Sequence, residues 1–266
     1  MGSFRLGTSG WSYKDWAGPF YPKGTAAGDY LREYAEAFDI VEVDSTYYRT
    51  PNPAVVGGWA DKTPAGFRFA VKMVNTVTHE KVLEDCEGER DEFLSALAPL
   101  GEKLHSVLLQ FGYFNKKAFA GPEAFMDRLE KFLEAFPRNV PVAVEIRNKW
   151  WLTAAFFELL SRHKAAFCLC DHVWMPSVAR VIEEHDVRTG PFVYLRLIGD
   201  RKGIEAVTTR WDQVAVDRSE RLREIAVALR GLPSGTEIVT FVNNHFAGHA
   251  PATVRELAAM MEGLDR

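Results

Sequence analysis

Eight short apolar runs recur along the chain of 266 residues, and segments with helical periodicity lie between them. Apolar strands that alternate with amphipathic helices are typical of a parallel sheet covered by helices. Eight such units in this length favour an α/β fold with a single closed (β/α)8 barrel of the TIM type, because an open doubly wound sheet usually has fewer strands. The predicted strands are residues 4–10, 40–46, 68–74, 106–112, 141–147, 165–171, 192–198 and 237–243.

The segments between the predicted strands carry apolar residues at helical spacing together with capping residues. Six are well defined, at residues 28–38, 89–104, 121–136, 152–164, 218–232 and 250–264, and two are weaker, at 52–63 and 176–185. The sequence contains no G-x-G-x-x-G or Walker motif, no linker and no low-complexity segment. We therefore expect one barrel domain over residues 1–266.

The net charge and the hydropathy of the sequence indicate which kinds of binding partner to expect. A formal net charge of -4 and a pI near 6.0 do not indicate nucleic acid as a partner, although a local basic pocket would be compatible with it. No stretch reaches the roughly 18 apolar residues of a membrane span, and the N-terminus lacks the pattern of a signal peptide. These features predict a cytoplasmic protein without a membrane contact, and they leave the oligomeric state open.

Each predicted strand ends on small or polar residues. Because the carboxyl ends of barrel strands carry the active site, these residues are expected to surround one mouth. In residues 141–147 the alternation of side chains turns Glu145 and Arg147 into the barrel, and the same count turns Glu42 and Lys72 inward. The side chains predicted to line one connected cavity are Glu42, Lys72, Glu145, Arg147, Asp171, Arg196 and Asn243.

At these strand ends the chain resembles a known family. In order, its segments are similar to signature segments of the YecE-like proteins, catalogued as domain of unknown function 72: "GTSGWSYKDW" with "FYP", "VEVDSTYY", "FAVK" with "THEK", "LLQF", "AVEIRNKWW", "YLRLIG" and "FVNNHFAGHAPATVREL". The resemblance covers about residues 5–260. It implies a TIM-type barrel and no established activity. The chain departs from the family pattern at Ile198, where a histidine is usual, and in "STYY", where Thr-Phe-Tyr is usual.

The charged residues suggest roles at the mouth. The candidates for acid–base catalysis are Glu145, Asp171, Glu42 and Lys72, with Glu145 the best placed. Arg147 and Arg196 are expected to bind the anionic part of a ligand, since the guanidinium group donates two hydrogen bonds in a fixed plane. Further ligand contacts are expected from Trp11, Tyr47, Gln110, Trp150, Asn243 and Asn244. The alternative is that these charges form a purely structural ion-pair network.

Three functions fit this pattern. The first is an enzyme acting on a small anionic substrate that contains a phosphate or a nucleotide, by hydrolysis or lyase chemistry. The second is a non-catalytic module that binds a small anion or single-stranded nucleic acid. The third is a metal-dependent sugar isomerase or epimerase, with a divalent metal on Glu145 and Asp171 and on His79, His172 or His245. A glycosidase with paired acids on strands four and seven is disfavoured, because those strands end in Gln110 and Arg196.

The thiols form a separate pattern. Cys168 and Cys170 lie two positions apart, so both should face the same side of one strand. Three cysteines do not suggest a disulfide framework. We expect core thiols here, and a metal or redox pair is the weaker alternative.

Overall fold

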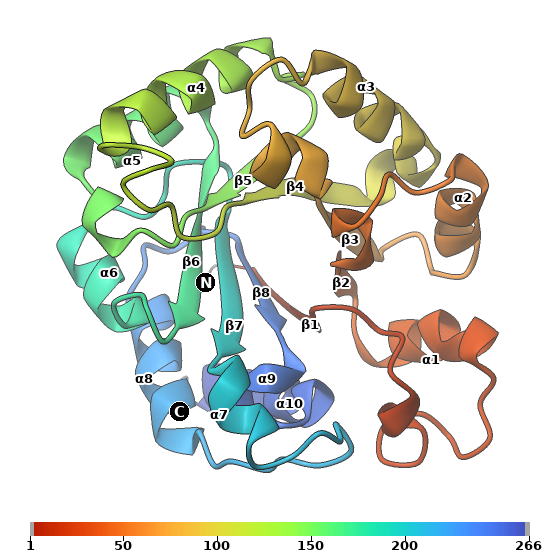
Figure 1. The fold of residues 1–266 in the computed structure, drawn as a ribbon. Helices are drawn as coiled ribbons and strands as arrows, with labels where there is room; N and C mark the ends of the chain where they lie inside the picture. Colours follow the sequence, from red (N-terminus) through yellow and green to blue (C-terminus); the bar gives the residue numbers. More distant parts are fainter. Residues whose placement is uncertain (1–2, 264–266) are drawn as a thin grey trace.

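The predicted barrel is confirmed. The structure, a computed structural model, describes residues 3–263 and contains eight parallel strands in the order β1-β8-β7-β6-β5-β4-β3-β2. Figure 1 shows the strands around a common centre with the helices outside them. All eight predicted segments form strands, which are Phe4–Thr8 (β1), Ile40–Val43 (β2), Arg68–Lys72 (β3), Leu104–Gln110 (β4), Val142–Glu145 (β5), Ala166–His172 (β6), Val193–Gly199 (β7) and Ile238–Val242 (β8).

Helices follow the strands where the periodicity predicts them. They are Tyr30–Ala37 (α1), Pro53–Asp61 (α2), Glu87–Ala96 (α3), Pro122–Ala135 (α4), Ala154–His163 (α5), Val178–Glu184 (α6), Ser219–Arg230 (α8) and Ala250–Gly263 (α10). Two short helices that the periodicity did not predict, Arg201–Glu205 (α7) and Asn244–Ala247 (α9), follow β7 and β8. Side chains cap the start of several helices. At the start of α2, Asn52 Oδ1 accepts a hydrogen bond from the Ala54 backbone N–H at 2.8 Å.

One helix is shorter than predicted. The segment expected to be helical over residues 89–104 ends as an α-helix at Ala96 and continues as 3-10 turns over Ala98–Lys103. Pro99 cannot donate a backbone hydrogen bond, and Gly101 has a φ of 51°, outside the helical region. These two residues therefore end the helix before β4 begins.

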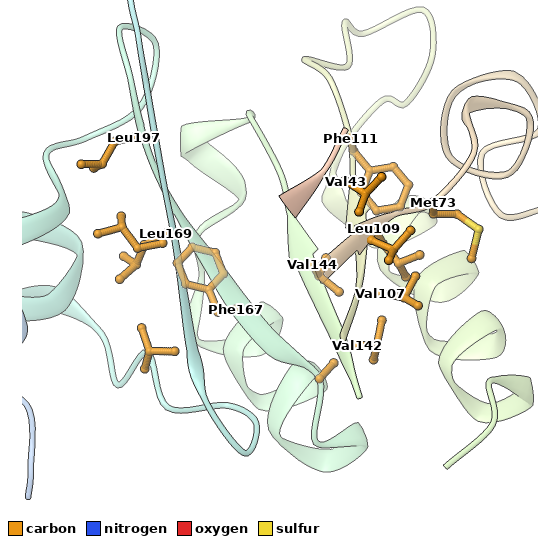
Figure 2. Close-up of a cluster of buried hydrophobic side chains, with 14 of the residues drawn as sticks. Val43, Met73, Val107, Leu109, Phe111, Val142, Val144, Phe167, Leu169 and Leu197 are labelled. Carbon is orange, nitrogen blue, oxygen red and sulfur yellow. The ribbon is translucent and has the colours of Figure 1, made fainter. Parts of the chain in front are cut away.

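Apolar side chains form two layers, one inside the barrel and one between the strands and the surrounding helices. Ala143 belongs to the inner layer, whereas Val142 and Val144 pack outward, as the alternation predicts. Figure 2 shows members of the outer layer, among them Val107 and Leu109 of β4. The inner layer consists of Ile40, Ala70, Leu108, Ala143, Ala166, Cys168, Phe192, Tyr194, Val239 and Phe241. On five strands the next inward position toward the strand end is polar, so these side chains lie above an apolar floor: Glu42, Lys72, Gln110, Glu145 and Arg196.

The barrel closes between β1 and β2 through a tyrosine hydroxyl. Within residues 3–263, the sheet ladder between these strands is a single bridge from Ser9 to Glu42. The Tyr34 hydroxyl accepts from the Thr8 backbone N–H at 2.9 Å and donates to the Ile40 carbonyl at 3.0 Å. It replaces a ladder hydrogen bond at a buried seam. A Cβ on Gly7 would lie 2.2 Å from the Ile40 oxygen, so the seam also requires glycine at this position.

We expect Tyr34→Phe to lower the free energy of unfolding by about 1–3 kcal/mol, because it leaves a buried N–H and a buried C=O without their partner. Urea denaturation at pH 7 measures the loss. Tyr30→Phe is the matched control, since Tyr30 is also buried on α1 and its hydroxyl makes no hydrogen bond within the described residues. An equal effect of the two substitutions would show that the Tyr34 hydroxyl does not hold the seam.

Candidate functional site

Arg196 of β7 lies at the centre of a buried ion cluster. Its Nη1 donates to Glu145 Oε2 at 2.7 Å, and its Nη2 donates to Glu42 Oε1 at 2.8 Å. The Arg196 side chain is 2% exposed and both carboxylates are fully buried. Arg147 Nε donates to the other Glu145 oxygen at 2.9 Å, and the Tyr194 hydroxyl donates to the other Glu42 oxygen at 2.6 Å. We call Glu42, Glu145, Arg147 and Arg196 the central ion cluster.

Within the central ion cluster, each charged group shifts the pKa of its partners. Burial alone would raise the pKa of Glu145, but Arg196 and Arg147 outweigh it and lower that pKa to about 2. Burial would lower the pKa of Arg196, but Glu42 and Glu145 outweigh it and raise that pKa well above its usual value. Glu145 is therefore a carboxylate at pH 7 and has no proton to donate. Each of its carboxylate oxygens already accepts a hydrogen bond from an arginine. Glu145 is therefore better suited to fix the positions of these arginines than to transfer protons.

Lys72 and Asp44 lie beside this cluster, and Asp44 is partly exposed to solvent. Lys72 Nζ is 3.4 Å from Asp44 Oδ1 and 4.2 Å from the centre of the Tyr47 ring. Burial lowers the pKa of Lys72, and Asp44 offsets part of that effect. Burial would raise the pKa of Asp44, but Lys72 and Arg196 outweigh it and hold that pKa below its usual value. This pair combines a half-exposed carboxylate with an ammonium that loses its proton more readily than a surface lysine.

His79 reaches the same mouth from an irregular segment. It lies in a π-helical turn over Thr76–Glu80, and Val82 and Leu83 then adopt positive φ angles of 46° and 65°. The His79 ring meets the Tyr47 ring edge-on at 5.0 Å. Burial lowers the His79 pKa to about 4, with contributions from Lys72 and Arg147, so the ring is neutral at pH 7. Such backbone strain is typical of functional sites, and no pattern in the sequence predicts it.

Asp171 lies outside the mouth, and its predicted place there is wrong. Its two oxygens accept from Arg221 of α8, Oδ2 from Nε at 2.5 Å and Oδ1 from Nη2 at 2.9 Å. Cys168 belongs to the inner layer, and Cys170 follows it on the same side of β6, so Asp171 faces the helices. Both cysteines are buried free thiols, as expected, and burial raises the pKa of each.

Of the six other residues predicted to contact a ligand, three lie at the ends of strands or beside Lys72: Gln110, Tyr47 and Asn243. Gln110 is buried at the end of β4, in register with Glu145, and Tyr47 lies over Lys72. Asn243 Oδ1 caps α9 by accepting from the His245 backbone at 3.0 Å. The remaining three make no hydrogen bond or ion pair with the central ion cluster within residues 3–263.

Those three are Trp11, Asn244 and Trp150. Trp11 packs edge-on against Trp59 of α2 at 5.7 Å. Asn244 is buried, and its Oδ1 accepts from the Ala250 backbone at 2.9 Å. Trp150 projects into solvent beside the mouth. The first two positions are structural, because their polar or aromatic groups hold a loop or helix start against the barrel.

The donor set expected for a divalent metal does not converge. Glu145 is engaged by two arginines, Asp171 by Arg221, and His245 Nε2 lies 3.3 Å from Glu205. Across residues 3–263, no group of three or more His, Cys, Asp or Glu side chains is arranged to hold a metal ion. These residues do not fit the metal of a sugar isomerase.

Within residues 3–263, no helix has the length and apolar character to cross a membrane.

Comparisons with known proteins agree with this fold. A family model described as "Protein of unknown function DUF72" matches residues 5–265. The chain is 34% identical over 118 residues to UPF0759 protein YecE of Escherichia coli, a match that covers 44% of this chain and 41% of YecE. It is 29% identical over 196 residues to UPF0759 protein YunF of Bacillus subtilis, covering 68% of this chain and 66% of YunF.

Two solved structures extend the likeness. A DUF72 family protein from Thermotoga maritima has a TM-score of 0.76 at 25% identity, covering 99% of this chain and 100% of that chain. Another from Enterococcus faecalis has a TM-score of 0.73 at 22% identity, covering 97% of this chain and 95% of that chain. Because the family model spans the barrel from its first strand to its last helix, the chain belongs to the DUF72 family.

Proposed function

We propose that the protein is an enzyme that acts on a small anionic substrate at the C-terminal mouth of the barrel, with Arg147 holding the anion. One observation carries the proposal. Arg147 Nε is fixed on Glu145, its side chain is 20% exposed, and its two Nη groups donate no hydrogen bond within residues 3–263. A guanidinium that is anchored at one edge and open at the other is prepared for a phosphate or carboxylate group.

Arg196 takes a different role in this proposal from the one that the sequence suggested. Both of its Nη groups are engaged by carboxylates and its side chain is buried, so it has no accessible fork to offer a ligand. It is a positioning residue, which holds Glu145 and through it Arg147. Lys72 is the candidate for proton transfer. Burial lowers the pKa of its ammonium group below the usual value for lysine, so it releases its proton more readily.

The second candidate is a module that binds an anion without turnover. The observation that favours it is the full engagement of Glu42 and Glu145, which leaves fewer groups for acid–base chemistry. Screening phosphate monoesters and diesters for release of inorganic phosphate or alcohol separates the two. Saturable binding with no turnover of any member of that panel would favour the module.

Ribose 5-phosphate is the probe for the anion site, measured by calorimetry. We expect Arg147→Met to weaken its binding about 10- to 100-fold, the effect of losing about 1.5–3 kcal/mol of hydrogen bonds to a charged group. Arg32→Met, an exposed arginine on α1, is the control and should bind as the wild type does. Absence of binding to the wild type, or equal affinity in Arg147→Met, would contradict the proposal.

A further inference from the structure

A hollow lies beside the strand ends of β4, β5 and β6, and Arg147 of the central ion cluster is one of the residues that line it. This depression has a volume of about 830 Å³, and the residues that matter here are Tyr113, Arg147, Lys149, Trp150, Trp174 and Arg180. Tyr113 follows β4, Trp150 follows β5 and Trp174 follows β6, so three consecutive loops of the barrel supply one aromatic ring each. We call it the aromatic depression.

The three rings are exposed, although two of their loops are anchored by other residues. Trp150 is 80% exposed, Tyr113 61% and Trp174 59%. Their immediate neighbours in two of these loops do the packing: the rings of Phe114 and Trp151 stack at 5.8 Å. Since the packing needs of the loops are met by these neighbours, Tyr113 and Trp150 contribute little to stability, and exposed aromatic rings gathered at one hollow mark a binding surface.

The two loops that carry Tyr113 and Trp150 are also clamped to each other. Asn148 accepts from the Phe114 backbone N–H and donates to the Phe114 carbonyl, both at 2.8 Å. This paired hydrogen bond holds the loop after β4 against the loop after β5. The backbones that carry Tyr113 and Trp150 are therefore held together before a ligand binds, which reduces the entropy lost in ordering the two loops.

The charge of the aromatic depression is positive. Arg147 brings its free Nη groups, and Lys149 Nζ lies 4.8 Å from the centre of the Trp150 ring. Arg180 is paired with Glu184 at 2.8 Å. The lining of the depression therefore holds three cations and one carboxylate, Glu184, while the partner of Arg147, Glu145, is fully buried.

We propose that the aromatic depression binds the planar ring of the substrate whose anionic group lies on Arg147. The ligand class is then a phosphorylated compound with an aromatic ring, for which a mononucleotide is the simplest probe. The inference rests on the proposed function, because Arg147 is common to both sites. Exposed indole rings stack on any base, so the choice of base is secondary.

Calorimetry with AMP, ribose 5-phosphate and adenosine tests the proposal. We expect AMP to bind the wild type about tenfold or more tightly than ribose 5-phosphate, as stacking of one base typically provides. The Trp150→Ala/Trp174→Ala double variant should lose that preference and keep its affinity for ribose 5-phosphate. Both side chains are exposed, so the double variant should fold. The control is Tyr48→Ala, which removes a ring that is 78% exposed but does not line the depression.

The outcomes separate the two proposals. If ribose 5-phosphate binds through Arg147 but AMP binds no more tightly, or if the AMP preference survives in the double variant, the aromatic depression is not the ring site and the proposed function stands. If ribose 5-phosphate does not bind, the proposed function fails. In that case adenosine binding that is lost in the double variant would still support the ring site, and absence of adenosine binding would overturn it.

Discussion

Replacing Arg196 with methionine is expected to lower the free energy of unfolding by about 3–5 kcal/mol, the largest effect on stability of any substitution considered. Arg196 is the shared partner of Glu42 and Glu145, and neither carboxylate has access to solvent. Methionine fills much of the volume but leaves two negative charges facing each other in the barrel. Urea denaturation at pH 7, followed by circular dichroism, measures the loss of stability without an assay of activity.

A rescue experiment distinguishes charge from packing. The triple variant Arg196→Met/Glu42→Gln/Glu145→Gln removes the cation together with both carboxylates, and it should recover part of the stability that Arg196→Met loses. The three changes should therefore be strongly non-additive. A loss below about 1 kcal/mol in Arg196→Met, or simple addition of the single effects, would show that the central ion cluster is not a coupled unit.

Replacing Lys72 is expected to reduce turnover about 10²- to 10⁴-fold, the usual contribution of a general acid or base. Both Lys72→Met and Lys72→Arg should show the loss, because arginine keeps the charge but does not release its proton at accessible pH. Binding of ribose 5-phosphate should persist in Lys72→Arg. The measurement is the rate of product release for whichever phosphate ester of the panel the wild type turns over.

The pH profile gives a second readout for Lys72. A general base acts in its neutral form, so the wild-type rate should rise with pH and level off above the Lys72 pKa, which burial places below the usual value of 10.5. Lys116→Met, an exposed lysine in the loop after β4, is the control and should keep both rate and profile. If Lys72→Arg retains the wild-type rate, the ammonium acts only as a fixed charge and the proton-transfer role is lost.

The site was partly predictable because side-chain direction along a strand is local. Alternation alone predicts that Glu42, Lys72 and Glu145 face the barrel, and the structure places them there. The same alternation excludes Asp171 once Cys168 is seen to face inward. The choice between the two faces of β6 was open in the sequence, since its alternate positions are all apolar up to the last two residues.

The roles of the charges were not predictable in the same way. Arg196 and Glu42 are 154 residues apart and Arg196 and Glu145 are 51 apart, so which carboxylate occupies which Nη group depends on the closure of the barrel. The pKa of Glu145 depends on that closure too, because burial and two arginines act on it in opposite directions. The sequence therefore does not determine the protonation state of Glu145. It predicted an anionic ligand on Arg196, whose two Nη groups are already engaged by carboxylates.

By itself, the sequence determined the eight β-α units, the family and the inward direction of most charged strand ends, because periodicity and motif order are properties of neighbouring residues. Only the tertiary structure decided which arginine remains open to a ligand and which aromatic rings remain exposed. Trp150 and Trp151 are adjacent and chemically identical, yet one packs on Phe114 and the other lies in solvent beside Arg147. That difference comes from contacts between loops distant in the chain, which no local pattern encodes.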